Sequence, residues 1–447
     1  DVVDENDIIR REARNSLQRG LAVKTTFMTL VSNTVEAVGI LANTLEGPKQ
    51  VAISRFVVDE LLVFAKSLVA HDGATVTVCN SLERLAFGSK VVQDVINVTG
   101  GIEISLELFR KRKPCVKEAV GMLCAAAFQS NVENADYFRS IGGMEDILSW
   151  IEQAVAGART GDPDCCATTK LLAVLCHDSK DSASRGLQGI KGDRGLTALL
   201  SIICTGNACA HVAALALSNS LAASLGSESA ARVMETGGLE NVCVYLKSCD
   251  STVSNSTIKE SLKVVRLCCE KYRPEAQDLA ANCGIFPYVV EWACEFRTPS
   301  KSDKGLPTDA LQVEACETLR WMTLNNFDIQ LFHTEGTVQR CLAILKDARV
   351  STPMLRLSAC RWISSVVEDH YEMQSMINSL GGYSVLVNAA IDGTRMVRAH
   401  ALLALATLAT ENNTIKDLVA SANNILNVVD ELARRSFSDA PPELADG

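Results

Sequence analysis

The sequence contains six histidines and seventeen cysteines, side chains that can bind metal ions or take part in catalysis. Their spacing indicates whether they could hold a metal ion. The histidines, at 71, 177, 211, 333, 370 and 400, have no metal-ligand spacing to one another or to cysteine. The doublets Cys165–Cys166 and Cys268–Cys269 lack the Cys-x2-Cys pairing with which two thiolates reach one zinc ion. The sequence therefore predicts no metal site and no cofactor, and we interpret the cysteines as small buried hydrophobic residues in a reducing compartment.

Two further patterns bear on catalysis, a nucleophile turn and a phosphate-binding loop. The sequence contains no Gly-x-Ser-x-Gly turn. The glycine-rich stretch 186–195 carries Lys191 and Arg194, but a phosphate loop needs Gly-Lys-Ser/Thr after a strand, and here Lys191 precedes Gly192. A degenerate turn between helices explains this stretch better, with a weak anion site as the alternative. We predict no catalytic residue and no enzymatic activity in this chain.

The net charge of −10 decides between classes of partner. Phosphate binding needs a basic surface, so we predict no nucleic-acid partner, and no apolar run reaches the roughly 18 residues of a membrane span. The basic run Arg110–Lys113 falls where a helix should end, and cations there complement the helix dipole; the alternative is a short nuclear-import signal. We expect a cytoplasmic protein, with access to the nucleus under that alternative. The missing initial Met and the Ser- and Pro-containing end suggest a piece of a longer protein.

Composition and periodicity both predict helices. Hydrophobic residues make up 47% of the chain but aromatic residues only 5%, so the core must be built from Ala, Leu, Val, Ile and Cys. Proline occurs only 10 times, and the long stretches without Pro or Gly space their apolar residues at a period of about 3.6 rather than alternating them. Such small side chains suit closely packed helices, and we predict a chain that is nearly all α-helix.

A repeating unit organises these helices. Each unit has a helix with a small residue, an apolar residue four positions later, and a glycine turn that opens a further apolar helix. The small residues, 41 to 54 positions apart, are Val78, Ala119, Ala167, Ala213, Ser261, Ala315, Ala359 and Ala401. Their apolar partners are Leu82, Leu123, Leu171, Leu217, Val265, Leu319, Ile363 and Leu405. The turns lie at Gly100–Gly101, Gly142–Gly143, Gly195, Gly237–Gly238, Gly284, Gly336 and Gly381–Gly382, and we predict a left-handed glycine in each.

This pattern resembles the armadillo repeat family, whose unit has a short first helix, a second helix and a long third helix. The resemblance covers roughly residues 75–435 and implies an all-α fold, a right-handed superhelical solenoid of about eight to ten three-helix repeats. Residues 1–74 are predicted to be N-terminal helices, at 8–17, 23–45 and 51–68, that form either a cap or further degenerate repeats. Residues 436–447 are predicted to be a disordered tail.

The resemblance also implies where a partner binds. Third helices line a concave groove that takes extended peptides, and side chains two and six positions after each small residue should point into it. The importin-α pattern would place Trp in the first set and Asn in the second, and only Asn219 matches it, so we predict a mixed groove and no recognition of basic localisation signals. The candidate partner-binding residues are Asn80, Arg84, Asn219, Lys263, Glu317, Trp321 and Arg361.

Three of these candidates fall in neighbouring repeats. Glu317, Trp321 and Arg361 could form a polar and aromatic patch that holds a peptide main chain and one anchor side chain. The alternative is that Trp321 packs between repeats and the charges are solvated. Trp362 lies one position off the groove line, and we predict that it belongs to the core.

These observations predict a non-catalytic protein-interaction scaffold or adaptor that binds a partner peptide or helix, in a setting such as a cytoskeletal, ciliary or signalling assembly. One alternative is a chaperone or exchange-factor-like regulator that grips a folded client, such as a small GTPase, an Hsp70 or a myosin. A second alternative is the binding module of a larger enzyme.

Overall fold

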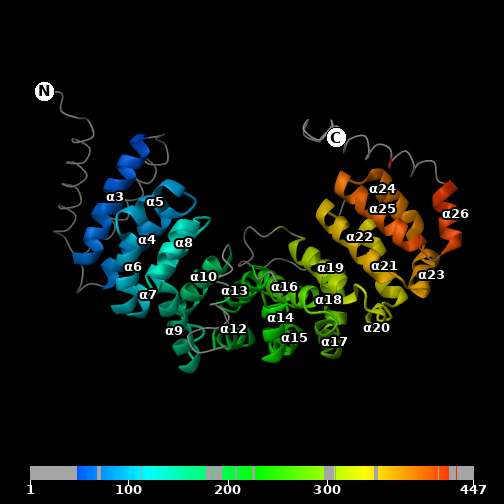
Figure 1. Ribbon diagram of the computed structural model, residues 1–447, viewed down its shortest axis with the longest axis horizontal. Coiled ribbons are helices and arrows are strands. Elements are labelled where there is room, and N and C mark those ends of the chain that lie inside the picture. The colour runs from blue at the N-terminus through cyan, green and yellow to red at the C-terminus, as the bar shows by residue number, and fades with distance from the viewer. Residues whose placement is uncertain are drawn as a thin grey trace. The chain divides into compact units, whose positions relative to one another are not determined.

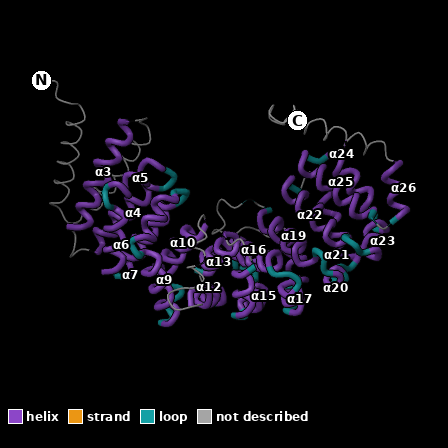
Figure 2. The backbone as a smooth tube through the Cα atoms, viewed as in Figure 1, coloured by secondary structure: helices purple, strands orange, loops and turns teal. Residues whose placement is uncertain are grey.

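The computed structural model describes residues 48–67, 72–111, 113–177, 184, 194–206, 209–223, 227–295, 307, 309–346, 351–410, 412–421 and 429. Within these residues every regular element is a helix, and the helices are joined by short loops (Figure 2). The chain divides into two compact units, Asp1–Leu225 and Gly226–Gly447, and each is described by itself (Figure 1).

The helices of the first unit follow one another in groups of three, in which a short helix comes first and the longest comes third, as in α5, α6 and α7. In chain order they are α3 (Pro48–Ser67), α4 (Asp72–Ala86), α5 (Lys90–Val98), α6 (Gly101–Lys111), α7 (Pro114–Phe128), α8 (Val132–Ser140), α9 (Gly143–Ala156), α10 (Pro163–His177), α12 (Arg194–Cys204) and α13 (Ala210–Ala223). The helices that carry the small residues are α4, α7, α10 and α13, and each packs on the next. They are the third helices of successive repeats.

The second unit continues the same order of helices. These are α14 (Glu228–Glu235), α15 (Gly238–Ser248), α16 (Asn255–Lys271), α17 (Glu275–Asn282), α18 (Phe286–Cys294), α19 (Ala310–Thr323), α20 (Phe327–Gln330), α21 (Glu335–Lys346), α22 (Pro353–Val367), α23 (Tyr371–Ser379), α24 (Gly382–Asp392), α25 (Arg395–Ala409) and α26 (Asn413–Ser421). The third helices here are α16, α19, α22 and α25, which again pack in sequence.

The core of both units is built as the repeat pattern predicts. All eight small residues and all eight apolar partners are buried. At Gly121 the helices α7 and α10 approach closely, since a Cβ there would lie 3.2 Å from the carbonyl carbon of Ala167. The prediction of an all-α repeat fold with closely packed third helices is confirmed.

The glycine turns are confirmed at five of the seven places and wrong at two. Gly142, for example, caps α9 with a φ of 86°, a conformation that costs a residue with a Cβ more. Gly195 and Gly336 lie inside the first turns of α12 and α21 and have no positive φ. At the second of these, Thr334 replaces the glycine turn, because its Oγ1 accepts a hydrogen bond from the N–H of Thr337 at 3.3 Å.

A second junction, which the sequence reading missed, joins four of the third helices, α4, α7, α19 and α22, to the first helix that follows. One residue with positive φ is followed by a side-chain cap, and the pairs are Gly88–Ser89, Ser130–Asn131, Asn325–Asn326 and Asp369–His370. Each cap accepts a hydrogen bond from an N–H three residues on, which satisfies one free donor of the helix start.

Buried glutamines then tie one repeat to the next. Gln330 donates from Nε2 to the carbonyl oxygens of Ser365 at 2.8 Å and Glu368 at 3.0 Å, at the end of α22. Gln93 and Gln277 make the same contacts to the ends of α7 and α19. Carbonyls at the end of a helix have no partner within it, so these glutamines supply one. Gln374 donates to the carbonyl oxygens of Val367 at 3.1 Å and Thr407 at 3.5 Å. We call Gln93, Gln277, Gln330 and Gln374 the glutamine ladder.

Several predictions for the chain ends fall on residues that the structure leaves out. The predicted helix at 51–68 is present as α3. The predicted helices at 8–17 and 23–45 and the predicted tail at 436–447 lie outside the described residues, as does most of the glycine-rich stretch 186–195. Whether residues 1–74 form a cap or degenerate repeats therefore stays a prediction.

Candidate functional site

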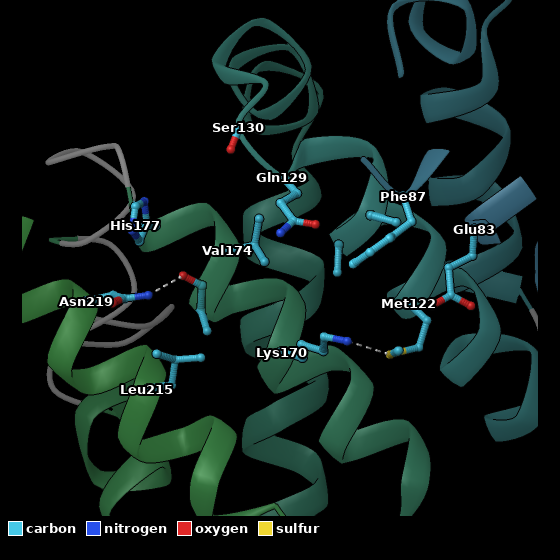
Figure 3. A pocket seen from close by; sticks show the side chains of 13 residues that line it. Glu83, Phe87, Met122, Gln129, Ser130, Lys170, Val174, His177, Leu215 and Asn219 are labelled. Carbon is cyan, nitrogen blue, oxygen red and sulfur yellow. Dashed lines mark hydrogen bonds between the residues drawn. The ribbon is translucent and has the colours of Figure 1, made fainter. Parts of the chain in front are cut away.

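The third helices of the first unit enclose a pocket of about 410 Å³ (Figure 3). Alanines of α7 and α10 line it, together with larger side chains that come from α4, α7, α10 and α13. Thirteen residues line it: Glu83, Phe87, Met122, Ala125, Ala126, Gln129, Ser130, Lys170, Ala173, Val174, His177, Leu215 and Asn219. The lining is mostly apolar, with a few polar groups at the edge, as in pockets that bind ligands.

The pocket exists because small side chains occupy the outer face of two neighbouring helices. Ala125 and Ala126 on α7 and Ala173 on α10 end at Cβ, so no side chain fills the space in front of them. The first turn after α4 then brings Phe87 to the rim, where 67% of its surface is exposed. A large exposed aromatic side chain beside an open apolar hollow is typical of a surface that binds another molecule.

Two charges at this pocket have no ionic partner among the described residues. Lys170 Nζ lies 3.8 Å from Met122 Sδ, a weak acceptor, and no described carboxylate pairs with it. Glu83 likewise pairs with no described basic side chain. On the far wall, Asn219 Nδ2 donates to the carbonyl oxygen of Ala173 at 3.0 Å (Figure 3), which fixes the amide and leaves Oδ1 as an acceptor.

The structure corrects the predicted groove positions on α7 and α10. Gly121 and Thr169, two residues after the small residue, are buried, whereas Met122 and Lys170, one residue later, line the pocket. Ala125 and Ala173, six residues after the small residue, line the pocket as predicted. The physical reason for the difference at Gly121 is contact between third helices, since a Cβ there would lie 3.2 Å from the carbonyl carbon of Ala167 on α10. The sequence reading therefore missed Met122, Lys170 and Val174.

The predicted binding residues of the first unit are only partly brought together. Asn219 lines the pocket. Asn80 and Arg84 are exposed on α4 but do not line it, and their neighbours Glu83 and Phe87 do.

In the second unit, the predicted residues Glu317 and Arg361 meet in an ion-pair network. Glu317 Oε1 lies 3.3 Å from Arg361 Nη1 and accepts a hydrogen bond from Ser358 Oγ at 2.9 Å. Its Oε2 lies 3.2 Å from Arg320 Nη1. Arg361 Nη2 is 3.3 Å from Nε2 of His400 on the next third helix. Burial first, and then Arg361 and Arg320, lower the pKa of His400, which keeps its imidazole neutral at pH 7.

Trp321 lies beside this network and is half-buried. The guanidinium groups of Arg320 and Arg273 stand over its ring, 4.9 and 5.4 Å from the centroid. Cations at such distances are attracted by the ring face. The structure thus places Glu317, Trp321 and Arg361 close to one another, in contacts within the protein.

Lys263, the remaining candidate, belongs to a neighbouring set of compensated charges on α16. Its Nζ lies 3.9 Å from Glu260, which also pairs with Lys259 at 2.9 Å. One turn further on, Arg266 Nε lies 2.6 Å from Glu314 of α19. The outer face of α16 and α19 is therefore covered by paired charges.

Trp362 is core, as predicted. It is 1% exposed, and its Nε1 donates to Nε2 of the buried His333 at 2.9 Å. Burial lowers the pKa of His333 to about 4, so its imidazole is neutral and accepts this bond.

The basic run ends a helix, as one of its two interpretations predicts. Arg110 and Lys111 occupy the last turn of α6 and pair with Asp146 and Glu107, and Lys113 pairs with Asp72 at 3.1 Å. Among the described residues no cluster of three or more His, Cys, Asp or Glu could hold a metal ion. Within the same ranges, no helix has both the length and the apolar character to cross a membrane.

Neither a family model nor a curated protein matches this sequence. Among solved structures, an engineered protein is similar with a TM-score of 0.68 at 17% identity, over 94% of this chain and 97% of that one. A second engineered protein has a TM-score of 0.47 at 17% identity, over 58% of this chain and 96% of that one. A designed armadillo repeat protein in complex with the peptide (KR)4 also has 0.47, at 16% identity, over 58% and 99%. At such identities the likeness concerns the fold alone. The helices of this chain themselves form an armadillo-like repeat, with a third helix that packs on the next third helix in each unit.

Proposed function

We propose that this protein is a non-catalytic interaction scaffold that holds an extended segment of a partner protein across its third helices, with one apolar side chain of that segment in the first-unit pocket. The observation that carries the proposal is the pocket itself, an open apolar hollow with two charges at its edge that no described side chain of opposite charge pairs with. A cytoplasmic adaptor role, in an assembly such as a cytoskeletal or signalling one, is part of the proposal; most of the cysteines are buried in helices as small hydrophobic residues, which fits a reducing compartment.

The size and lining of the pocket suit one large apolar side chain. A volume of about 410 Å³ accommodates a leucine, methionine or aromatic group with part of its main chain. Burying such a side chain contributes roughly 1.5–3 kcal/mol, and covering Phe87 adds to this. One buried anchor of this kind is what commonly dominates the affinity of a protein interface.

The polar groups at the edge favour a particular arrangement of charges in the bound segment. Lys170 on α10 would pair with an acidic residue, and Glu83 on α4 with a basic one, on the two sides of the anchor. Oδ1 of Asn219 would accept an N–H of the main chain. These contacts fix direction and register more than they add affinity, because exposed ion pairs contribute only about 0–1 kcal/mol.

The test is a selection from a displayed library of random dodecamer peptides on the full chain, followed by measured affinities of the enriched peptides. We expect peptides with one large apolar residue flanked by opposite charges. Leu215→Asp, which places a carboxylate on the pocket wall, should weaken their binding at least roughly tenfold, the equivalent of 1.4 kcal/mol.

Leu403→Asp is the matched control. Leu403 holds the same position relative to its repeat's small residue, two residues after Ala401, and is 54% exposed on α25 in the other unit. It should leave the affinity unchanged. Equal losses in both variants, or enriched peptides without a large apolar residue, would rule out the pocket as the anchor site.

A further inference from the structure

Four large apolar side chains are exposed along one edge of the second unit, where α17, α20 and α23 follow one another (Figure 1). Phe327 begins α20, Leu331 lies one helical turn further on, Phe332 comes next, and Tyr371 begins α23. Each of them is between 45% and 58% exposed. We call these four residues the aromatic edge.

Ring contacts within the unit hold the aromatic edge together. The Phe327 ring stacks on the imidazole of His370, with centroids 4.1 Å apart and planes 5° from parallel. His370 is buried and directly precedes Tyr371, so this contact brings the starts of α20 and α23 together. Phe332 meets the buried Phe286 of α18 edge to face, with centroids 5.8 Å apart. The rings are thus ordered before any partner arrives, which lowers the entropy lost on binding.

The repeat itself does not require aromatic residues at these places. The residue that follows the side-chain cap of a first helix is Lys90 in α5, Val132 in α8, Phe327 in α20 and Tyr371 in α23. The caps therefore work equally well with a cation or a small apolar residue beside them. Single exposed apolar residues are common, but a group that the fold does not need is typical of a surface that binds another protein.

The charges around the aromatic edge are negative. Four exposed carboxylates lie next to its residues in the chain or at the start of α21, and none of them pairs with a described basic side chain: Asp328, Glu335, Asp369 and Glu372. Carboxylates in the first turn of a helix are favoured by the helix dipole, but they keep their charge toward solvent. Arg273 and Arg320 of the same unit stand over the ring of Trp321 instead.

We propose that the aromatic edge binds a basic amphipathic helix of a partner protein. Such a helix carries an apolar stripe that would cover the exposed rings, and basic residues beside the stripe would face the four carboxylates. Two turns of a helix rise about 11 Å, similar to the 8–10 Å between packed helices, so one stripe can reach both α20 and α23. The net charge of −10 favours the approach of a basic segment.

The aromatic edge belongs to the second unit, whereas the pocket proposed to hold an extended segment belongs to the first. Leu215→Asp, which blocks the pocket, should therefore leave binding at the aromatic edge unchanged. Failure of either proposal can be told from failure of the other.

The test measures the fluorescence anisotropy of a labelled amphipathic peptide, with leucines on one helical face and lysines on the other, mixed with the full chain. We expect saturable binding, and no binding of the same peptide with glutamates in place of the lysines. The double variant Phe327→Ser, Tyr371→Ser should weaken binding at least about tenfold. The double variant Asp328→Asn, Glu372→Gln should weaken it about threefold and increase its sensitivity to salt less than the unmodified chain shows.

Matched controls come from α8 of the first unit. Val132 and Glu133 hold the same two places after the cap Asn131 as Phe327 and Asp328 hold after Asn326. Val132→Ser and Glu133→Gln should leave the affinity within about twofold, or 0.4 kcal/mol.

Hydrogen exchange on the unmodified chain tests the same surface without any substitution. The bound lysine peptide should slow exchange in α20 and at the start of α23. Protection confined to other helices, equal losses in the α8 variants, or equal binding of the glutamate peptide would overturn the proposal. Self-association of the unmodified chain in sedimentation that is lost in Phe327→Ser, Tyr371→Ser would overturn it too, and would assign the aromatic edge to a second copy of the chain.

Discussion

Along the third helices of the first unit, Ala125, Ala126 and Ala173 leave a hollow on the outer face, whereas along those of the second unit Glu317, Arg320 and Arg361 fill the outer face with paired charges. The core beneath both faces is built in the same way, from buried small residues at the repeat spacing. The repeat thus determines the core, and the residues just outside the core determine what each surface can bind.

The two surfaces also differ in the state of their charges. Lys170 and Glu83 at the pocket have no described ionic partner, and a bound segment could supply one. Glu317 already accepts from Ser358 and pairs with two arginines. A ligand that used these arginines would first have to break contacts within the protein, which lowers the net gain. We therefore place the anchor in the first unit.

The largest expected effect concerns the feature that the two units share, the glutamine ladder. Gln330→Leu in the second unit and Gln93→Leu in the first should each destabilise the protein by about 2–5 kcal/mol, because each leaves buried carbonyl oxygens without a donor. Urea unfolding with hydrogen exchange by mass spectrometry would measure this and show which repeats open. The exposed Gln153→Leu is the control, with a change under about 0.5 kcal/mol. If only one of the two glutamine variants lost stability, the glutamine ladder would not stabilise the two units in the same way.

The next effect is pH-dependent and belongs to the second unit alone. His333 has a folded-state pKa of about 4, below the unfolded value near 6.5, so the unfolded chain binds more protons between these values. Stability is thus complete above about pH 6.5 and falls by roughly 3 kcal/mol as the pH decreases to 4. His333→Gln should flatten this part of the stability profile, and replacing the exposed His177 by Gln should not. An unchanged slope would mean that His333 is protonated in the fold.

The smallest expected effect sharpens the comparison most directly. The combined variant Glu317→Ala, Trp321→Ala and Arg361→Ala removes the patch predicted from the sequence but leaves the first unit intact. Pocket-binding peptides should keep their affinity within about twofold, or 0.4 kcal/mol, once circular dichroism shows that the variant is folded. A pull-down with the unmodified chain and with this variant, analysed by mass spectrometry, makes the same comparison for whole partner proteins. A loss of binding would move the partner site to the second unit.

Much of the fold could be predicted because the repeat shows in the local sequence, as a regular spacing of small residues, apolar residues and glycines. The small residues from Val78 to Ala401 and their apolar partners are all buried where the spacing predicts, and most glycine turns are left-handed. The glutamine ladder could in principle have been found, since Gln330 and Gln374 both stand four residues after a capping residue. It was missed because a glutamine gives no signal of burial until the carbonyls it bonds to are known.

The candidate site depended more on tertiary structure. The sequence indicated third helices as the binding surface and selected Asn219, which does line the pocket. It could not show that Met122 and Lys170 line the pocket whereas Gly121 and Thr169 are buried, because this depends on which residues pack against the neighbouring third helix. Nor could it tell Lys170, which pairs with no described carboxylate, from Arg361, which pairs with Glu317, because pairing depends on which side chain the neighbouring repeat brings within reach. Local spacing thus determined the repeat and its core, and only packing between repeats decided which surface stayed open.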